Sequence, residues 1–432
     1  MRFLIAVAVT IFATLPAWAE VRIKEVTSPG GITAWLVEEP SIPFVALELR
    51  FQGGASLDAP GKRGATNLMM GLLEEGAGDL DSQGFARASE ALAAQFTYDI
   101  GDDTASISAR FLTENRDEAV ELLRLSIIEP TFDEVSLERV RQQVLAGIRS
   151  SETDPNDIAG RAFDAQAFGD HPYATSLKGT LDSVTALSQD DIRAAHQSVL
   201  TRDRLFVGAV GDITEEELGL LLDRLLADLP DTGAPMPGKV APALDGSTQV
   251  VEFDTPQSVA LFGQIGMERD HDDFFAAYLL NTILGGSGFE SRLMEEVRVK
   301  RGLTYGVYSY LVPKDHAALY MGSVSSANDR IGEAIEVIRA EWARMAAEGV
   351  TQDELDKAKA LLTGAYPLRF DGNGSIARIM VGMQIQGLPI DYIVTRNDKV
   401  NAVTLEDVNR VAGELLQPEG LTFVVVGKPE GV

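Results

Sequence analysis

An internal duplication constrains the fold of this chain more than any other feature of the sequence. The segment 183–192, SVTALSQDDI, matches the segment 399–408, KVNAVTLEDV, at a spacing of 216 residues. The segments 205–211 and 421–427 match at the same spacing without a gap. Because this period is about half of the chain, whereas solenoid repeats are about 20–50 residues long, the sequence predicts two similar domains.

Hydrophobic periodicity gives the first half a mixture of strands and helices. Alternating apolar and polar residues predict strands, and apolar residues at helical spacing predict amphipathic helices. The mixture is typical of an α+β domain, with a mostly antiparallel sheet and helices packed on one face of it. The predicted strands are 33–37, 45–51, 96–100, 104–111 and 204–210, and the predicted helices are 64–76, 85–94, 117–128 and 134–151.

The N-terminus and one internal segment divide the chain. Residues 1–19 combine Arg2, an apolar run and the small-x-small sequence Ala-Trp-Ala, which predicts a secretory signal peptide. Residues 231–247 hold three prolines and three glycines with little periodicity, and are the predicted linker. We therefore expect an N-terminal domain at 20–230 and a C-terminal domain at 248–432. Export to the periplasm without a membrane anchor is expected, since no later apolar run is long enough to span a bilayer.

The charge of the chain makes nucleic acid an unexpected partner. The sequence has 65 acidic and 37 basic residues, a formal net charge of −28, whereas phosphate backbones require a basic face. The acidity indicates a solvated surface, with an acidic lining for cationic peptides as the alternative. The absence of cysteine excludes disulfides and thiolate metal ligands.

Two groups of residues, one in each half, resemble the pitrilysin or insulinase family of zinc peptidases. The first is Gly-Asp-His-Pro-Tyr at 169–173, followed by Lys-Gly-Thr at 178–180. The second runs from Leu-Gly-Gly-Ser-Gly-Phe at 284–289 to Arg-Gly-Leu-Thr-Tyr at 301–305, with Ser-Arg-Leu at 291–293 between them. The resemblance implies that two similar α+β domains form half of a clamshell chamber for unfolded peptides.

The family's zinc motif is absent where the resemblance would place it. Catalytic members carry His-x-x-Glu-His on a helix, the inverzincin arrangement, and a further Glu far downstream. The two histidines share a helical face and bind zinc, and the Glu takes a proton from the zinc-bound water. On the helix 64–76 the motif falls on Asn67, Met70 and Gly71, and the downstream ligand falls on Gly147.

A shifted register does not restore the motif, because the chain has few histidines. The nearest two of the four are 25 residues apart; the four are His171, His196, His271 and His316. We therefore expect no bound metal and no zinc hydrolysis by this chain alone. His171 is expected to stabilise a turn, and a metal site that joins His271 and His316 is the disfavoured alternative.

A second pair of family residues is retained. Arg298 and Tyr305 have the spacing of an Arg and a Tyr that, in the family, reach across the chamber toward the zinc site. A tyrosine hydroxyl can donate a hydrogen bond to the oxyanion that forms during hydrolysis, and a guanidinium can anchor the peptide. The alternative is an ordinary structural role, with Tyr305 beginning a strand and Arg298 lying among other helix charges.

The sequence thus supports two main hypotheses. In the first, the chain is the non-catalytic subunit of an exported two-chain zinc peptidase, like the inactive chain of mitochondrial processing peptidase. A catalytic partner would then hold the zinc, and this chain would contribute Arg298 and Tyr305. In the second, the chain is a catalytically inactive homodimer that binds peptides or acts as a scaffold. An unconventional metal enzyme is a third hypothesis, which bound metal would support.

Overall fold

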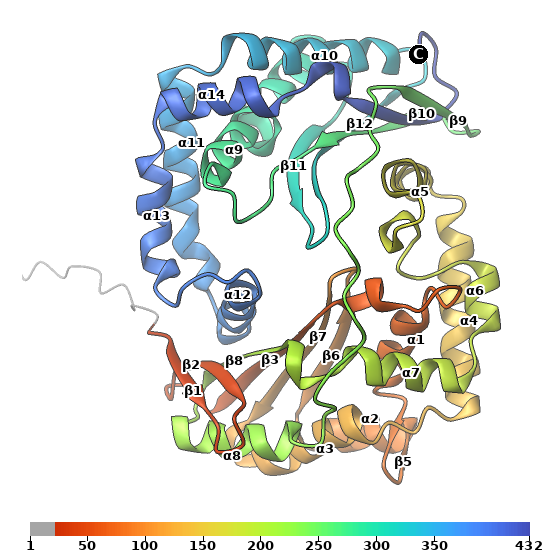
Figure 1. Cartoon of the computed structure of the whole chain (residues 1–432), viewed down its shortest axis with the longest axis vertical. Helices are drawn as coiled ribbons and strands as arrows, with labels where there is room; N and C mark the ends of the chain where they lie inside the picture. Colours follow the sequence, from red (N-terminus) through yellow and green to blue (C-terminus); the bar gives the residue numbers. More distant parts are fainter. Residues whose placement is uncertain (1–21) are drawn as a thin grey trace, which may run out of the picture.

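The computed structural model describes residues 22–432, so the predicted signal peptide at 1–19 lies outside the described residues. Each half of the chain builds one large β-sheet, and Figure 1 shows these two sheets in opposite parts of the molecule. Helices surround both sheets (Figure 1), so the predicted α+β fold with two similar units is confirmed. No helix within residues 22–432 has the length and apolar character that a bilayer crossing requires.

The first sheet has six strands in the order β1-β2-β8-β3-β7-β6. All neighbours pair antiparallel except β2 and β8, which are parallel. The strands are β1 (Lys24–Thr27), β2 (Thr33–Glu38), β3 (Phe44–Gln52), β6 (Gln95–Ile100), β7 (Thr104–Leu112) and β8 (Leu205–Gly211). All five strands predicted in this half are therefore present to within about two residues.

Several helices of the first half cover one face of this sheet. Along β3, Val45, Leu47 and Leu49 are buried toward the helices, because successive side chains of a strand point to opposite faces. The helices are α1 (Ala65–Leu72), α2 (Ser82–Ala91), α3 (Arg116–Ile128), α4 (Glu134–Ser151), α5 (Pro155–Phe168), α6 (Leu181–Ala186), α7 (Gln189–Val199) and α8 (Glu215–Leu226).

The prediction that the first of these helices extends to Gly76 is wrong. Helix α1 ends at Leu72, and Gly76 begins the short strand β4 (Gly76–Ala77), which pairs with β5 (Leu80–Asp81). Gly76 has a φ of +143°, a conformation that glycine adopts readily and other residues avoid. The glycine therefore starts a hairpin rather than closing the helix.

The second half repeats this architecture. Its sheet has five strands in the order β11-β12-β10-β13-β9, and the pair β13 and β9 is parallel. The strands are β9 (Thr248–Glu252), β10 (Gln257–Ile265), β11 (Val307–Pro313), β12 (Ala318–Ala327) and β13 (Thr422–Gly427). The helices are α9 (Phe274–Asn281), α10 (Ile331–Glu348), α11 (Gln352–Ala365), α12 (Asn373–Ile385), α13 (Tyr392–Ala402) and α14 (Leu405–Leu415).

The duplication found in the sequence is visible at equivalent elements. Helices α7 and α14 begin and end at positions that differ by 216 residues. Both begin with a capping box, Ser188 with Asp191 and Thr404 with Asp407. A capping box satisfies backbone N–H groups that the first helical turn leaves without partners, so the same local signal sets the start of both helices.

One helix of each half packs on the sheet of the other half, an arrangement that the sequence did not predict. Helix α5 of the first half packs on β10 and β13 of the second sheet, and α12 of the second half packs on β3 and β8 of the first. Figure 1 shows both helices between the two sheets. The prediction of helices on one sheet face was therefore incomplete, because each sheet is also contacted on its other face by a helix of the other half.

Phe163 anchors helix α5 on the second sheet, and shortening it tests this packing. Its ring is fully buried in a cluster with residues such as Leu319 and Val424 of the second sheet. We expect Phe163→Leu to lower the free energy of unfolding by about 1–2 kcal/mol, because the smaller side chain leaves unfilled volume. Urea denaturation measures this, with the exposed Leu368→Ala as control; equal stability of the two variants would contradict the packing role.

Residues 231–247, the predicted linker, contain neither helix nor strand. The Val240 N–H donates to the His316 carbonyl at 2.8 Å, and the Ala243 N–H donates to the Ala167 carbonyl at 2.8 Å. This segment is therefore held along the molecule between the first sheet and the second.

Candidate functional site

Helix α1 holds three of the four positions where the family's zinc motif would lie, and Asp58 fixes its start. The Asp58 carboxylate accepts hydrogen bonds from the N–H groups of Gly64 and Thr66, each at 2.8 Å, and from the Thr66 hydroxyl at 2.6 Å. Burial raises the pKa of Asp58, and these hydrogen bonds oppose the rise. The start of the helix is thus fixed by protein groups alone.

The structure places the four positions on two packed helices. Asn67, Met70 and Gly71 lie on α1, and Gly147 lies on α4, against which α1 packs. Met70 is 1% exposed and belongs to the core of the first half. A side-chain carbon added at Gly71 would meet Val140 at 3.3 Å, whereas nothing lies within 4 Å of such a carbon at Gly147.

These positions offer no ligand set for zinc. Asparagine is a poor zinc ligand beside imidazole or carboxylate, and methionine cannot take a proton from water. Among residues 22–432, the structure has no cluster of three or more His, Asp or Glu side chains that could hold a metal ion. Helix α1 is therefore a packing element whose core-facing residues hold it against α4, α7 and β6.

Tyr305 lies in a short loop before β11, and its side chain is 85% exposed. The loop is anchored on the N-terminal side of the tyrosine, where Leu303 is buried and its N–H donates to the Val297 carbonyl at 2.9 Å. The Thr304 hydroxyl donates to the carbonyls of Gly306 and Ser325, at 2.8 and 2.6 Å. These bonds hold Tyr305 outward.

Arg298 precedes this loop in a helical turn, Met294–Val299, and is half-buried. Its neighbour Arg301 is committed to a structural ion pair, because its guanidinium donates to the Glu296 carboxylate at 2.7 Å. Lys300 donates to the same carboxylate at 2.6 Å, and these bonds hold the pKa of Glu296 below its usual value. The Arg301 guanidinium is thus bonded to a carboxylate of its own helical segment.

The first sheet offers a free edge close to helix α1. Strand β6 is the last strand in the sheet order, and within residues 22–432 it pairs with β7 alone. Helix α1 contacts β6. An exposed edge presents unpaired N–H and C=O groups to which an extended peptide can add as a further strand. The peptide would then lie beside the helix that carries Asn67 and Gly71.

A polar joint connects the tip of the β11–β12 hairpin to the first half. Lys314 donates to the Asp102 carboxylate at 2.6 Å, and Arg63 donates to the other oxygen of Asp102 at 2.9 Å. The Tyr173 hydroxyl donates to Asp103 and accepts a bond from the His316 N–H at 3.2 Å. These bonds hold the two halves in one arrangement.

The predicted turn role of His171 is confirmed. Its Nδ1 accepts a hydrogen bond from the Tyr173 N–H at 3.2 Å and thereby caps the turn that Pro172 begins. His316 packs against the rings of His171 and Tyr173. His271 instead caps its own turn, where its Nδ1 accepts from the Asp273 N–H at 3.1 Å.

Asp164 on α5 lies near this joint and gives a pH-dependent prediction. Burial raises the pKa of Asp164 to about 6, and the charges of Lys314 and Arg63 oppose the rise. An Asp in an unfolded chain titrates near pH 3.9, so the folded state binds the proton more tightly and loses stability as the pH rises from about 4 through 6. We expect Asp164→Asn to be more stable than the native chain at pH 7, by up to about 3 kcal/mol.

Melting temperatures measured between pH 4 and 7 check this expectation. The difference between Asp164→Asn and the native chain should shrink as the pH falls and be smallest near pH 4, where the folded-state carboxyl is protonated and the unfolded-state carboxyl is about half protonated. The exposed Asp170 provides the control, since Asp170→Asn changes the same charge at the surface. A difference that stays constant across this pH range would contradict the prediction.

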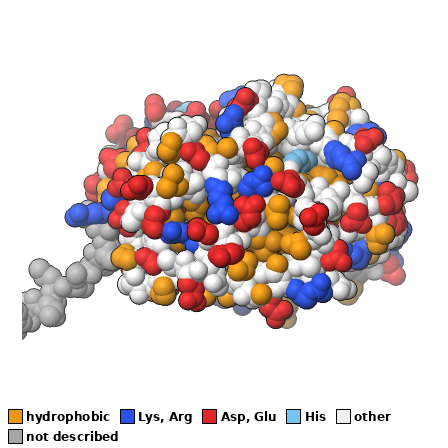
Figure 2. Space-filling view, turned by 90° about the horizontal axis from the view of Figure 1, so that it is seen from below, with side chains coloured by type: hydrophobic (Ala, Val, Ile, Leu, Met, Phe, Trp, Pro, Cys, Tyr) orange, Lys and Arg blue, Asp and Glu red, His pale blue; other side chains and the backbone are white. Residues whose placement is uncertain are grey.

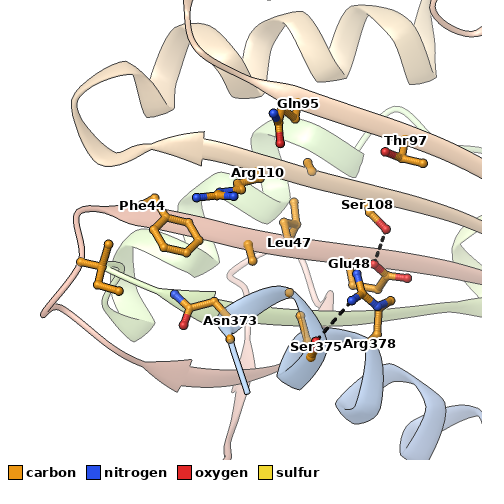
Figure 3. Close-up of a pocket in the computed structure, with 16 residues that line it drawn as sticks. Phe44, Leu47, Glu48, Gln95, Thr97, Ser108, Arg110, Asn373, Ser375 and Arg378 are labelled. Carbon is orange, nitrogen blue, oxygen red and sulfur yellow. Dashed lines mark hydrogen bonds between the residues drawn. The ribbon is translucent and has the colours of Figure 1, made fainter. Parts of the chain in front are cut away.

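Sequence reasoning missed a pocket of 520 Å³ between the start of α12 and strands β3, β6 and β7. Its charged and polar lining includes Glu48, Arg110, Asn373 and Arg378, shown in Figure 3. In the sequence, the glycines at 372 and 374 indicated an unusual backbone conformation. They did not show that the helix they begin, α12, packs on the sheet of the other half of the chain. Periodicity does not show which sheet a helix joins, so these residues could not be brought together from the sequence.

The outer face of the first half has no single-sign surface. Figure 2 shows acidic and basic side chains intermingled around apolar ones. Arg116 on α3 pairs with Glu217 on α8 at 2.9 Å, and Arg124 on α3 pairs with Asp228, just after α8, at 3.0 Å. Basic residues on this face are thus neutralised by nearby acids.

Two family models match the chain over most of its length. The one described as insulinase (peptidase family M16) matches residues 34–181, and the one described as peptidase M16 inactive domain matches residues 186–362. The chain is 28% identical over 429 residues to the non-peptidase homolog YmxG of Helicobacter pylori, with 98% of each chain covered. It is 26% identical over 408 residues to an uncharacterized zinc protease of Streptomyces coelicolor, covering 91% of this chain and 87% of the relative.

Solved structures are similar along nearly the whole chain. A peptidase M16 inactive domain from Pseudomonas fluorescens superimposes with a TM-score of 0.88 and 28% identity, and covers 95% of this chain and 98% of its own. A protease from Helicobacter pylori has a TM-score of 0.85 at 19% identity, with 94% and 99% covered, and shows the same fold.

Proposed function

We propose that this chain is the non-catalytic subunit of an exported zinc metallopeptidase. The chain belongs to the insulinase family of M16 peptidases, and it lacks the family's zinc-binding side chains. In this proposal a paralogous partner carries His-x-x-Glu-His and binds the zinc. The present chain, secreted to the periplasm, closes half of the peptide chamber and presents Arg298 and Tyr305 to the partner's zinc site.

The observation that carries this proposal is the contrast between the two candidate sites. Met70, at the position of the catalytic base, is buried in the core, whereas Tyr305 is 85% exposed in a loop anchored by Leu303 and Thr304. This exposure leaves the Tyr305 ring and hydroxyl accessible to a partner chain, which a role at the partner's zinc site requires.

The chemistry of the pair suits peptide hydrolysis at a neighbouring metal. A zinc ion held by the partner would supply an activated water, and negative charge would develop on the carbonyl oxygen of the peptide bond under attack. The Tyr305 hydroxyl can donate a hydrogen bond to that oxygen, and the Arg298 guanidinium can hold a peptide carbonyl or carboxylate nearby. Neither residue binds the metal, so zinc affinity would belong to the partner alone.

Co-expression with a secreted relative that carries the zinc motif tests the proposal. We expect the two chains to co-purify and to cleave a fluorogenic peptide that neither chain cleaves alone. Arg298→Ala should raise the KM of the complex, because it removes a peptide anchor. The matched control is Arg193→Ala, which removes an exposed guanidinium that pairs with Asp190 on its own helix α7. Failure of the chains to associate, or activity that does not depend on Arg298 and Tyr305, would overturn the proposal.

A homodimeric peptide-binding or scaffold protein is the second candidate, which the free edge of β6 favours. Peptide addition to this edge requires main-chain hydrogen bonds only and no metal. The two candidates differ in the oligomeric state with and without the relative. A homodimer that persists when the zinc-bearing chain is added supports the second candidate.

A further inference from the structure

The pocket at the start of α12 contains an uncapped helix N-terminus. Residue Gly372 precedes the helix and offers no side chain to cap it. The N–H groups of Ser375 and Ile376 donate to the Gly372 carbonyl, at 3.1 and 3.2 Å, but those of Asn373 and Gly374 find no acceptor within residues 22–432. At the equivalent helix α5, the Asp154 carboxylate fills this role. Free N–H groups at a helix start attract negative charge.

The Asn373 side chain provides an independent sign of a missing ligand. Asn373 is 7% exposed, lines the pocket, and its buried Nδ2 group has no hydrogen-bond partner. Buried polar groups are nearly always hydrogen-bonded, since an unsatisfied one costs about 1–3 kcal/mol. Figure 3 shows the amide reaching into the pocket below Phe44. An acceptor bound here would satisfy it.

Arg110 supplies positive charge at the same end of the pocket. Its guanidinium lies 4.5 Å from the centre of the Phe44 ring, and no ion pair holds it within residues 22–432. The buried Glu48 lies at the other end beside Ser108 (Figure 3), where it accepts hydrogen bonds from Ser108 at 2.5 Å and Arg50 at 3.1 Å. The end formed by Arg110 and Asn373 therefore contains donors, with the acidic group already paired elsewhere.

We propose that this end of the pocket binds the C-terminal carboxylate of a peptide that lies along β6. Gln95 and Thr97, at the start of β6, line the pocket. A peptide added antiparallel to β6 runs from Ile100 toward Gln95, so its C-terminus arrives at the pocket. The single charge of a carboxylate matches one guanidinium, one amide and two N–H groups, and Ile42 and Phe44 offer apolar contact to the last side chain.

This inference rests on the proposed function in one respect, which is that a peptide enters the chamber. Its test uses the chain without a partner. The carboxylate site and the proposed catalytic partnership can therefore fail independently of each other. Binding of N-acetyl-leucine and N-acetyl-leucinamide to the purified mature chain is followed by NMR of the Ile42 methyl group, which lies in the pocket wall. We expect the acid to bind at least about tenfold more tightly than the amide, because only the acid forms charge-assisted hydrogen bonds.

Two variants in different elements test the donors. Asn373→Asp replaces the free donor by a negative charge, and Arg110→Gln removes the positive charge; each should weaken N-acetyl-leucine binding at least about tenfold. The control Asn401→Asp makes the same charge change at an exposed position of α13 and should bind as the native chain does. Melting temperatures identify any variant that does not fold, and the other variant then decides.

Three results would overturn the inference. The first is equal binding of the acid and the amide, and the second is unchanged binding in the folded pocket variants. The third is a preference for another anion. If N-acetyl-aspartamide binds as tightly as N-acetyl-leucine, the pocket binds an acidic side chain rather than a C-terminus. If inorganic phosphate displaces N-acetyl-leucine more readily than acetate does, the pocket binds phosphate.

Discussion

Replacing Tyr305 by Phe is expected to lower the kcat of the complex with a zinc-bearing partner by about 10²–10³-fold, the effect of losing one oxyanion donor in other enzymes. The change removes only a hydroxyl that is exposed and makes no hydrogen bond within residues 22–432. The stability of the chain should therefore not change. Steady-state hydrolysis of a fluorogenic peptide by the purified complex measures the effect.

A second tyrosine on the same edge of the sheet gives the matched control. Tyr308 lies three residues further along, is 53% exposed, and stacks on Tyr310 with ring centres 5.9 Å apart. Tyr308→Phe removes the same atom from the edge strand β11 that follows the Tyr305 loop, and should leave kcat within about twofold. If both variants lose activity equally, the loss does not report an oxyanion donor at Tyr305. If neither loses activity, Tyr305 has no part in hydrolysis.

The fold was predictable where the local pattern decides the structure. The alternation of residues 45–51 predicted β3, and the long amphipathic pattern at 134–151 predicted α4 with its observed ends. Both Asp133 and Thr404 precede helices as capping residues, so the chain itself marks where α4 and α14 begin. The duplication then extended this information to the second half.

Long-range placement was not predictable. Residues 155–168 and 373–385 are apolar on one face, but that pattern does not state which sheet receives the face. The structure shows that Phe163 packs under the second sheet and Ala377 under the first. The pocket at Asn373 depends on this arrangement, and so it could not be found from the sequence. The absence of a helical site with two histidines was predictable, because the histidine inventory required no structure, and the placement of the motif at Asn67, Met70 and Gly71 stays a prediction from the family resemblance.

The positions without zinc ligands fit one of two arrangements, an open site that lacks the ligand side chains or a region packed as core. Position 147 suggests open space, since nothing lies within 4 Å of an added Cβ there. Position 70 suggests the opposite, because Met70 is 1% exposed among core residues such as Leu68 and Leu72. The two observations fit one account, in which α1 is packed into the core while the surface of α4 is open at residue 147.

Met70→Glu distinguishes these accounts and is expected to destabilise the chain by more than about 4 kcal/mol. The change removes a buried apolar side chain and places a carboxyl group among apolar neighbours, and both effects cost stability. Burial raises the pKa of such a carboxyl, so the variant should lose further stability as the pH rises above about 4. Urea denaturation at pH 5 and 7 measures both effects. Met70→Leu keeps the volume and should cost less than about 1.5 kcal/mol. A Met70→Glu chain as stable as Met70→Leu would mean that the Glu side chain reaches open space, and that only the ligands, not the site, have been lost.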